Sequence, residues 1–187
     1  MKTILPNLGI VQASEPSTYL LTPFQDGEAA YLAFLSQATR KVRMMIYAFT
    51  LDDVVQRLIA LRGQGLDVKC IFDRSQAGGR TERTELQRLV AAGFVDGKDF
   101  LVGTSPLHHE INHLKATWLD DKFVLHGSWN YSTSASAQYN SIEMVESPEL
   151  AALFDQAFAF AWNWILQNES SYQTLRADAP PKDGGTP

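Results

Sequence analysis

The sequence predicts an α/β fold in which helices cover both faces of a mixed β-sheet. Apolar, strand-like segments alternate with segments of helical periodicity through the first hundred residues. Asp120-Asp121 then separates two apolar segments, as in an antiparallel hairpin, and Pro148 to Leu166 reads as a closing amphipathic helix. Crossover helices join parallel strands and tight turns join antiparallel ones, so both pairings are expected in one sheet.

The elements of the first half follow from apolar spacing and from helix caps. We expect strands over residues 19–22, 42–49, 66–72 and 100–102, and helices over 26–35, 52–63 and 81–92. Asp26 is a good N-cap, because its carboxylate can accept a backbone N–H of the first turn. Gly93 suits the C-cap of the third helix.

The second half of the sequence predicts a loop, a hairpin and three further elements. These are a loop over 103–112, strands over 113–119 and 122–126, a short helix over 132–137, a strand over 142–145 and a helix over 148–166. We therefore expect an N-terminal lead-in over 1–18, one domain over 19–167 and a flexible C-terminal tail over 168–187.

The composition is that of a globular protein, with 45% hydrophobic and 20% charged residues in 187. No apolar run reaches the length of a membrane span and no signal peptide is evident, so a cytoplasmic location is expected. The net charge of −5 shows no overall basic character, so any affinity for phosphate must be local. The single cysteine, Cys70, excludes an intramolecular disulfide.

One cluster of residues carries chemistry: His113-Leu114-Lys115, then Asp120 after four residues, then Gly127-Ser128-Trp129-Asn130 after six more. In an extended strand, His113 and Lys115 share one face about 6.6 Å apart, so one phosphate can touch both. An imidazole can attack phosphorus, and the ammonium of Lys115 and the amide of Asn130 can bind the oxygens that gain charge. Glu143 could accept the second ring proton of His113.

This spacing resembles the signature of the phospholipase D superfamily, known as the HKD motif. Two further segments strengthen the resemblance, Tyr47-Ala48-Phe49 at a strand end and the strand from Gly65 to Asp73. The resemblance implies a phospholipase D-like α-β-α sandwich with a mixed sheet and a single HKD motif per chain. A single-motif chain of this size is most similar to the Nuc-like endonuclease subgroup.

The resemblance also implies a mechanism and an assembly. His113 forms a phosphohistidine while a second histidine protonates the leaving oxygen, so a single-motif chain needs a homodimer that brings two copies of His113 together. Lys115 and Asn130 are the expected phosphate binders. Asp120, Gly127 and Ser128 are expected to support the site. No cofactor and no metal are expected.

We expect the substrate to be nucleic acid, and the protein to be a phosphodiesterase acting as a nuclease on DNA or RNA. Candidate substrate contacts are Arg74, Arg80, Trp129 and His109, although Trp129 is more readily explained as core packing and His109 as a loop residue. No stable membrane association is expected. One alternative is a phospholipase D or phosphatidyl transferase that acts on phospholipid. Another is a nucleic-acid-binding dimer without catalytic activity.

A competing motif overlaps His113. Residues 109–113 read His-Glu-Ile-Asn-His, which matches the His-Glu-x-x-His pattern of zinc proteases. That pattern requires a continuous helix to place both imidazoles on one face, and Pro106 and Asn112 disfavour a helix here. We therefore expect no zinc site.

Overall fold

The computed structural model describes residues 16–172 as a seven-stranded sheet and six helices. The strands are β1 (Ser17–Thr22), β2 (Lys41–Ile46), β3 (Asp67–Asp73), β4 (Phe100–Gly103), β5 (Lys115–Leu119), β6 (Phe123–Gly127) and β7 (Asn140–Glu146). The helices are α1 (Gly27–Leu35), α2 (Asp52–Gly63), α3 (Arg74–Ala77), α4 (Arg80–Ala91), α5 (Thr133–Ser136) and α6 (Pro148–Asn168).

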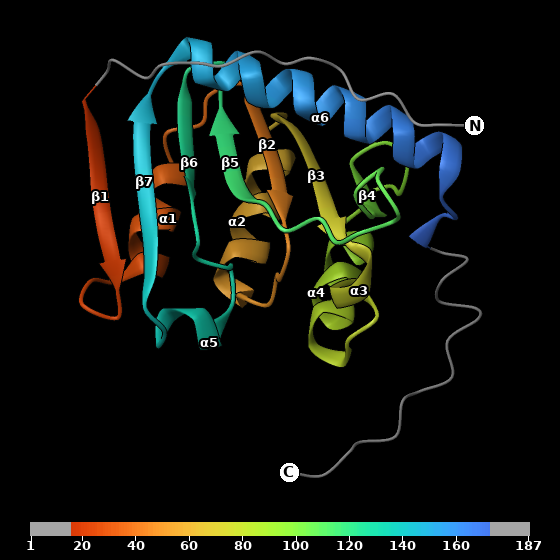
Figure 1. The fold of residues 1–187 in the computed structure, drawn as a ribbon, viewed down its shortest axis with the longest axis horizontal. Helices are drawn as coiled ribbons and strands as arrows, with labels where there is room; N and C mark the ends of the chain where they lie inside the picture. The colour runs from red at the N-terminus through yellow and green to blue at the C-terminus, as the bar shows by residue number, and fades with distance from the viewer. Residues whose placement is uncertain (1–15, 173–187) are drawn as a thin grey trace, which may run out of the picture.

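The sheet is mixed, with strand order β1-β7-β6-β5-β2-β3-β4 (Figure 1). Strands β2, β3 and β4 run parallel, and the pairs β2–β5, β5–β6, β6–β7 and β1–β7 are antiparallel. The expected fold class is therefore confirmed. The antiparallel β2–β5 pair brings the carboxyl end of β2 next to the amino end of β5, where Ile46 pairs with Lys115.

Two hydrophobic cores lie on opposite faces of the sheet. The long helix α6 runs across one face from β7 toward β4 (Figure 1). On that face Trp118, Val124 and Ile71 belong to one hydrophobic cluster with Phe158 and Ile165 of α6. The other face buries Phe72 and Thr117 beneath α1, α2 and α4. Since side chains alternate along a strand, the register decides which face each functional residue meets.

The structure adds one helix that the sequence pattern does not predict. Asp73 ends β3, and its Oδ1 accepts the backbone N–H of Ser75 at 2.9 Å and that of Gln76 at 3.3 Å. These bonds cap the short helix α3, which turns the chain away from the sheet. A strand-ending Asp that also caps a helix is the local signal that the hydrophobic pattern misses.

The packed unit extends beyond the expected domain boundaries at both ends. β1 begins at Ser17, and Tyr172 is buried with its ring 5.7 Å from that of Phe100. The remaining parts of the expected lead-in and tail, residues 1–15 and 173–187, lie outside the described residues.

Candidate active site

Lys115 opens β5 and is the buried cation of the site. Its side chain is almost fully enclosed, with its Nζ donating to the carbonyl oxygen of His113 at 2.8 Å and lying 5.0 Å from the ring centre of Tyr47. Burial lowers the pKa of Lys115 to about 8, and the nearby carboxylate of Asp73 opposes this shift. Lys115 is therefore protonated at pH 7 and loses its charge as the pH rises through 8.

His113 lies two residues earlier on an exposed stretch of chain. Its ring meets the Tyr47 ring edge-on with 4.8 Å between centroids, and Tyr47 accepts a hydrogen bond from Nε2 of Gln76 at 2.7 Å. Tyr47 thus contacts both His113 and Lys115. An exposed imidazole beside an enclosed ammonium leaves the imidazole accessible to a phosphate.

Asn130 approaches the same place from the end of β6. Its Oδ1 accepts the backbone N–H of Ala48 at 3.4 Å, and the next residue, Tyr131, donates its N–H to the carbonyl of Ala48 at 3.1 Å. Since Ala48 follows Tyr47, the segment that leaves β2 contacts all three proposed phosphate-handling residues. The structure therefore brings His113, Lys115 and Asn130 together where β2 ends and β5 begins.

Gly127 and Ser128 shape the turn that carries Asn130. A Cβ on Gly127 would lie 2.2 Å from the carbonyl oxygen of Ser141, so only glycine fits between the strands here. The Oγ of Ser128 accepts the N–H of Ser141 at 2.9 Å and donates to Asn140 at 3.1 Å. Both residues hold the turn against β7.

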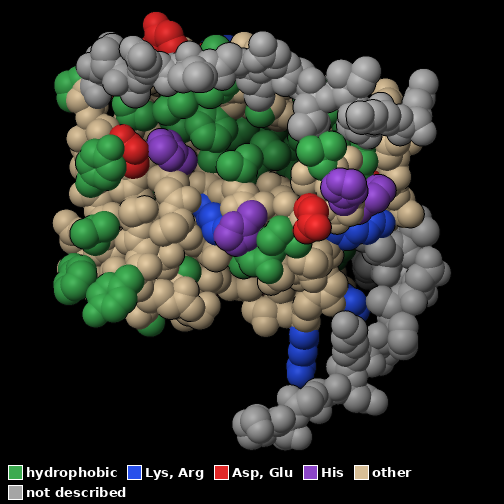
Figure 2. Space-filling view, viewed as in Figure 1, with side chains coloured by type: hydrophobic (Ala, Val, Ile, Leu, Met, Phe, Trp, Pro, Cys, Tyr) green, Lys and Arg blue, Asp and Glu red, His purple; other side chains and the backbone are tan. Residues whose placement is uncertain are grey.

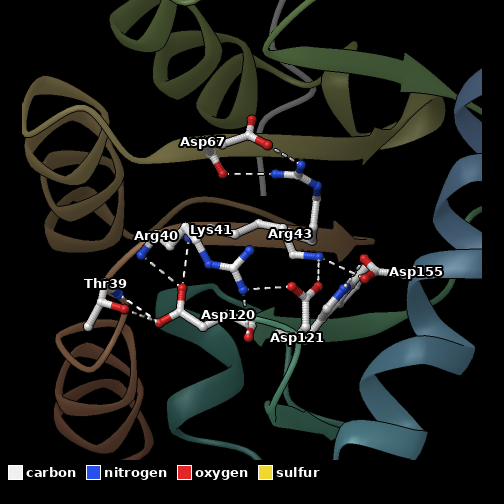
Figure 3. Close-up of polar contacts among 9 residues, drawn as sticks. Thr39, Arg40, Lys41, Arg43, Asp67, Asp120, Asp121 and Asp155 are labelled. Atoms are coloured by element: carbon white, nitrogen blue, oxygen red, sulfur yellow. Dashed lines mark hydrogen bonds and ion pairs between the residues drawn. The ribbon is translucent and has the colours of Figure 1, made fainter.

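Asp120 lies at the opposite end of β5, in the hairpin turn. Its carboxylate accepts the N–H groups of Thr39, Arg40 and Lys41 at 2.7 to 2.9 Å and the hydroxyl of Thr39 (Figure 3). These bonds lower the pKa of Asp120 against the opposing effect of burial. Asp120 anchors the start of β2 and lies at the end of β5 that is far from Lys115.

Glu143 does not orient His113 in this structure, contrary to expectation. Its Oε1 accepts the hydroxyl of Tyr19 at 2.6 Å, and its Oε2 lies 3.5 Å from Nε2 of His126. The register explains the difference: Glu143 pairs with His126, which in turn pairs with Ala116, on the face covered by α6. Lys115 precedes Ala116 and therefore faces the other side of the sheet.

Two buried carboxyl groups near the site were given no role in the site by the sequence prediction. Asp73 is fully buried, and its Oδ2 accepts the N–H of Asn112 at 2.7 Å, which anchors the chain directly before His113. Glu82, on α4, is 3% exposed and accepts the N–H of Phe49 at 3.0 Å. The strand-end position of Asp73 was a usable signal, whereas the helical pattern gave none for Glu82.

The expected substrate contacts differ in their exposure and in their partners. Trp129 is 1% exposed and packs against Tyr31 and Tyr131, so it belongs to the core and cannot stack on a base. Arg74 pairs with Glu169 at 2.6 Å, which joins α3 to the end of α6. Arg80 is exposed at the start of α4.

His109 lies in the loop before the site. Its ring is 5.4 Å from that of Trp164 and its Nδ1 is 3.4 Å from the hydroxyl of Thr104. Residues 104–114 form no helix, and both His108 and His109 have positive φ, so the His-Glu-x-x-His pattern does not present two imidazoles on one helix face. Within residues 16–172, no group of three His, Cys, Asp or Glu side chains could hold a metal ion.

Comparison with known proteins gives the family. A family model described as cardiolipin synthase, PLD-like domain, matches residues 31–162, which is most of the chain. This chain belongs to the phospholipase D-like domain family. The matched range contains the complete motif from His113 to Asn130.

Curated relatives are similar over part of their length. The mitochondrial cardiolipin hydrolase of Chlamydomonas reinhardtii is 27% identical over 134 residues, which cover 71% of this chain and 56% of the relative. Human protein FAM83B is 23% identical over 131 residues, which cover 66% of this chain and 13% of the relative. This chain thus spans about half of the first relative and a smaller share of the second.

Solved structures share the fold. Nuc, a phospholipase D family member from Salmonella typhimurium, superposes with a TM-score of 0.69 at 24% identity, over 80% of this chain and 96% of Nuc. NucT from Helicobacter pylori gives 0.67 at 18% identity, over 79% and 96%. Phosphatidylserine synthase from Haemophilus influenzae gives 0.59 at 14% identity, over 87% and 41%. Among the described helices, none is both long and apolar enough to cross a membrane.

Proposed function

We propose that this protein is a metal-independent nuclease that hydrolyses DNA or RNA through a phosphohistidine at His113. The observation that carries the proposal is the exposed His113 imidazole beside the enclosed ammonium of Lys115, with Asn130 held to the same segment of chain. Such an arrangement offers a nucleophile together with one charged and one neutral donor for phosphate oxygens. No step of this chemistry requires a metal ion.

The reaction needs two imidazoles in different protonation states. A ring nitrogen of His113 attacks phosphorus, and the new P–N bond forms as the P–O bond to the leaving group breaks. His113 of the partner subunit gives its proton to the leaving oxygen. Water then attacks phosphorus and loses a proton to that same partner imidazole, the P–N bond breaks, and both histidines return to their initial states.

The surface around His113 suits a homodimer built on this contact. Leu107, Ile111 and Leu114 are 43%, 42% and 39% exposed and flank His113 in sequence. Figure 2 shows histidine side chains beside hydrophobic ones on this face of the molecule. A two-fold axis near His113 would cover these apolar side chains, which is a reason for them to be apolar.

Nucleic acid is the proposed substrate because this chain resembles two nucleases of the same fold, Nuc and NucT, with TM-scores of 0.69 and 0.67. This chain covers nearly the full length of each of them. Phospholipid is the second candidate. It is favoured by the cardiolipin names of the family model and of the first curated relative. The two candidates share the same attack on a phosphodiester and differ only in the groups that flank the phosphorus.

The test is cleavage of single-stranded DNA, duplex DNA, RNA and cardiolipin vesicles, each with and without EDTA. His113→Asn is the inactive variant, and His126→Asn is the matched control, because His126 lies on the face covered by α6. We expect EDTA-resistant cleavage of a nucleic acid that is lost in His113→Asn and kept in His126→Asn. Cleavage of cardiolipin alone would overturn the nuclease assignment, and EDTA-sensitive cleavage would overturn the mechanism.

Mixing subunits tests the dimer. When wild type exchanges with His113→Asn at constant total subunit concentration, activity should fall with the square of the wild-type fraction, because mixed dimers lack one imidazole. A linear fall would contradict a shared site and would indicate that each subunit acts alone.

A further inference from the structure

Glu82 is a buried carboxyl group that the mechanism above does not use. It lies in the first turn of α4, is 3% exposed, and accepts the N–H of Phe49 through Oε2 at 3.0 Å. Its other oxygen, Oε1, is buried and has no hydrogen-bond partner among the described residues. A carboxyl group enclosed in this way costs stability, so its position calls for a physical reason.

The reason lies in how the sheet ends. β2 and β3 pair in parallel up to Ile46 and Phe72, and the chain of β3 turns into α3 after Asp73. The segment that continues from β2 therefore loses its strand neighbour on that side. The N–H of Phe49 would be buried without an acceptor, and Glu82 supplies one.

The other edge of the same segment holds Asn130. Ala48 donates its N–H to Oδ1 of Asn130 at 3.4 Å, and Thr50 donates its N–H to the carbonyl of Tyr131 at 2.8 Å. Alternate N–H groups of an extended segment point to opposite sides, so residues 48–50 are held between Glu82 and the turn that carries Asn130. A shift of this segment would move the amide that contacts phosphate.

The charge state of Glu82 is set by its surroundings. Burial raises the pKa of Glu82 to about 8, the N–H of Phe49 opposes that shift, and Asp73 adds to it. No cation of residues 16–172 forms an ion pair with Glu82. Glu82 is thus a neutral acid at pH 7 and becomes a carboxylate as the pH rises through about 8.

We propose that Glu82 is a positioning residue of the phosphodiesterase site: by accepting the N–H of Phe49 it holds residues 48–50, and through them the side chain of Asn130, in place for the phosphate. This inference rests on the proposed function. When Glu82 ionises, one N–H remains to solvate a buried charge beside Asp73. The segment then opens toward water, and Asn130 moves with it.

The experiment compares Glu82→Gln, which keeps a neutral acceptor for Phe49, with Glu82→Leu, which removes the acceptor at similar volume. Glu85→Gln is the matched control, because Glu85 lies one turn later on α4 and bonds to Arg88. The substrate is bis(4-nitrophenyl) phosphate, a small phosphodiester with neither a base nor an acyl chain.

At pH 6.5 we expect Glu82→Gln and Glu85→Gln to stay within about threefold of wild type. Glu82→Leu should lose about 10- to 100-fold in kcat with little change in KM, because a misplaced donor affects the transition state most. Between pH 8 and 10 the activity of wild type should fall more steeply than that of Glu82→Gln. The ionisation of Glu82 adds a factor of up to ten per pH unit to the fall of the wild type alone. The deprotonation of Lys115 is common to both and cancels in the comparison.

A stability measurement gives a second test that does not use the leucine variant. Since the pKa of Glu82 is raised in the folded state, the wild type should lose melting temperature between pH 5 and 8 relative to Glu82→Gln. The proposal would be overturned if activity fell equally steeply between pH 8 and 10 in wild type and Glu82→Gln, or if Glu82→Leu kept wild-type activity. Full activity in His113→Asn, or no hydrolysis by the wild type, would overturn the proposed function as well.

Discussion

The two ends of strand β5 handle charge in opposite ways. At the hairpin end, Asp120 accepts three backbone N–H groups and a hydroxyl, and Asp121 pairs with Arg40 and Lys41 (Figure 3). At the other end, Lys115 donates one hydrogen bond, to a backbone carbonyl, and forms no ion pair within residues 16–172. The segment from Lys115 to Asp120 therefore has one end where the hydrogen-bonding groups of the carboxylate are all satisfied, and one end where the ammonium makes few hydrogen bonds.

This difference separates stability from function. A carboxylate whose lone pairs are all used holds two strands together and has nothing left for a ligand. An enclosed ammonium with a single neutral partner costs stability, yet it interacts strongly with a phosphate that replaces the missing partners. Substitutions at the two ends should therefore affect different observables.

The largest effect is expected at the sparsely bonded end, for Lys115→Met. Loss of the charged donor should lower kcat/KM by about 10²- to 10³-fold, as for other preorganised transition-state donors. The melting temperature should stay equal or rise, because a buried cation gives way to an apolar chain of similar length. Steady-state kinetics at pH 7 measure the change in kcat/KM, and thermal unfolding at pH 7 measures the change in melting temperature. Activity within threefold of wild type would contradict the functional role assigned to the Lys115 end of β5.

A smaller effect, on stability alone, is expected for Asp120→Ala. Loss of the bonds to residues 39–41 should lower the free energy of unfolding by about 1.5–3 kcal/mol, with activity per folded molecule retained. The pKa of Asp120 is lowered in the folded state, so its stabilisation is present above pH 4 and fades as the pH falls through the folded value. Urea unfolding at pH 7 and pH 3 measures this; an equal penalty at both would count against it.

The smallest effect is expected for Asp121→Asn. Asp121 has a φ of 63°, a conformation that asparagine also adopts readily, so the turn is retained. Only the partly exposed ion pairs with Arg40 and Lys41 are lost, which is worth less than about 1 kcal/mol. The difference from wild type should vanish in 0.5 M salt. A loss as large as that of Asp120→Ala would show that the ion pairs, and not the backbone bonds, hold the hairpin.

Local patterns predicted most of the architecture. The cap at Asp26, the hairpin turn at 120–121 and the long helix from Pro148 are confirmed, because each depends on neighbouring residues alone. Helix α3 was missed because its N-cap, Asp73, is also the last residue of β3, so no turn separates the strand from the helix. Glu143 was misassigned because a one-residue change in strand register transfers a side chain to the other face of the sheet.

The sequence by itself determined the motif from His113 to Asn130, because the spacing of its residues along the chain does not depend on the fold. The surroundings of the motif were decided by the tertiary structure. Asp73, Glu82 and Tyr47 reach the site from β3, from α4 and from the end of β2. Those contacts, and the pKa values near 8 of Lys115 and Glu82 that burial produces, depend on segments that meet only when the sheet and its helices pack.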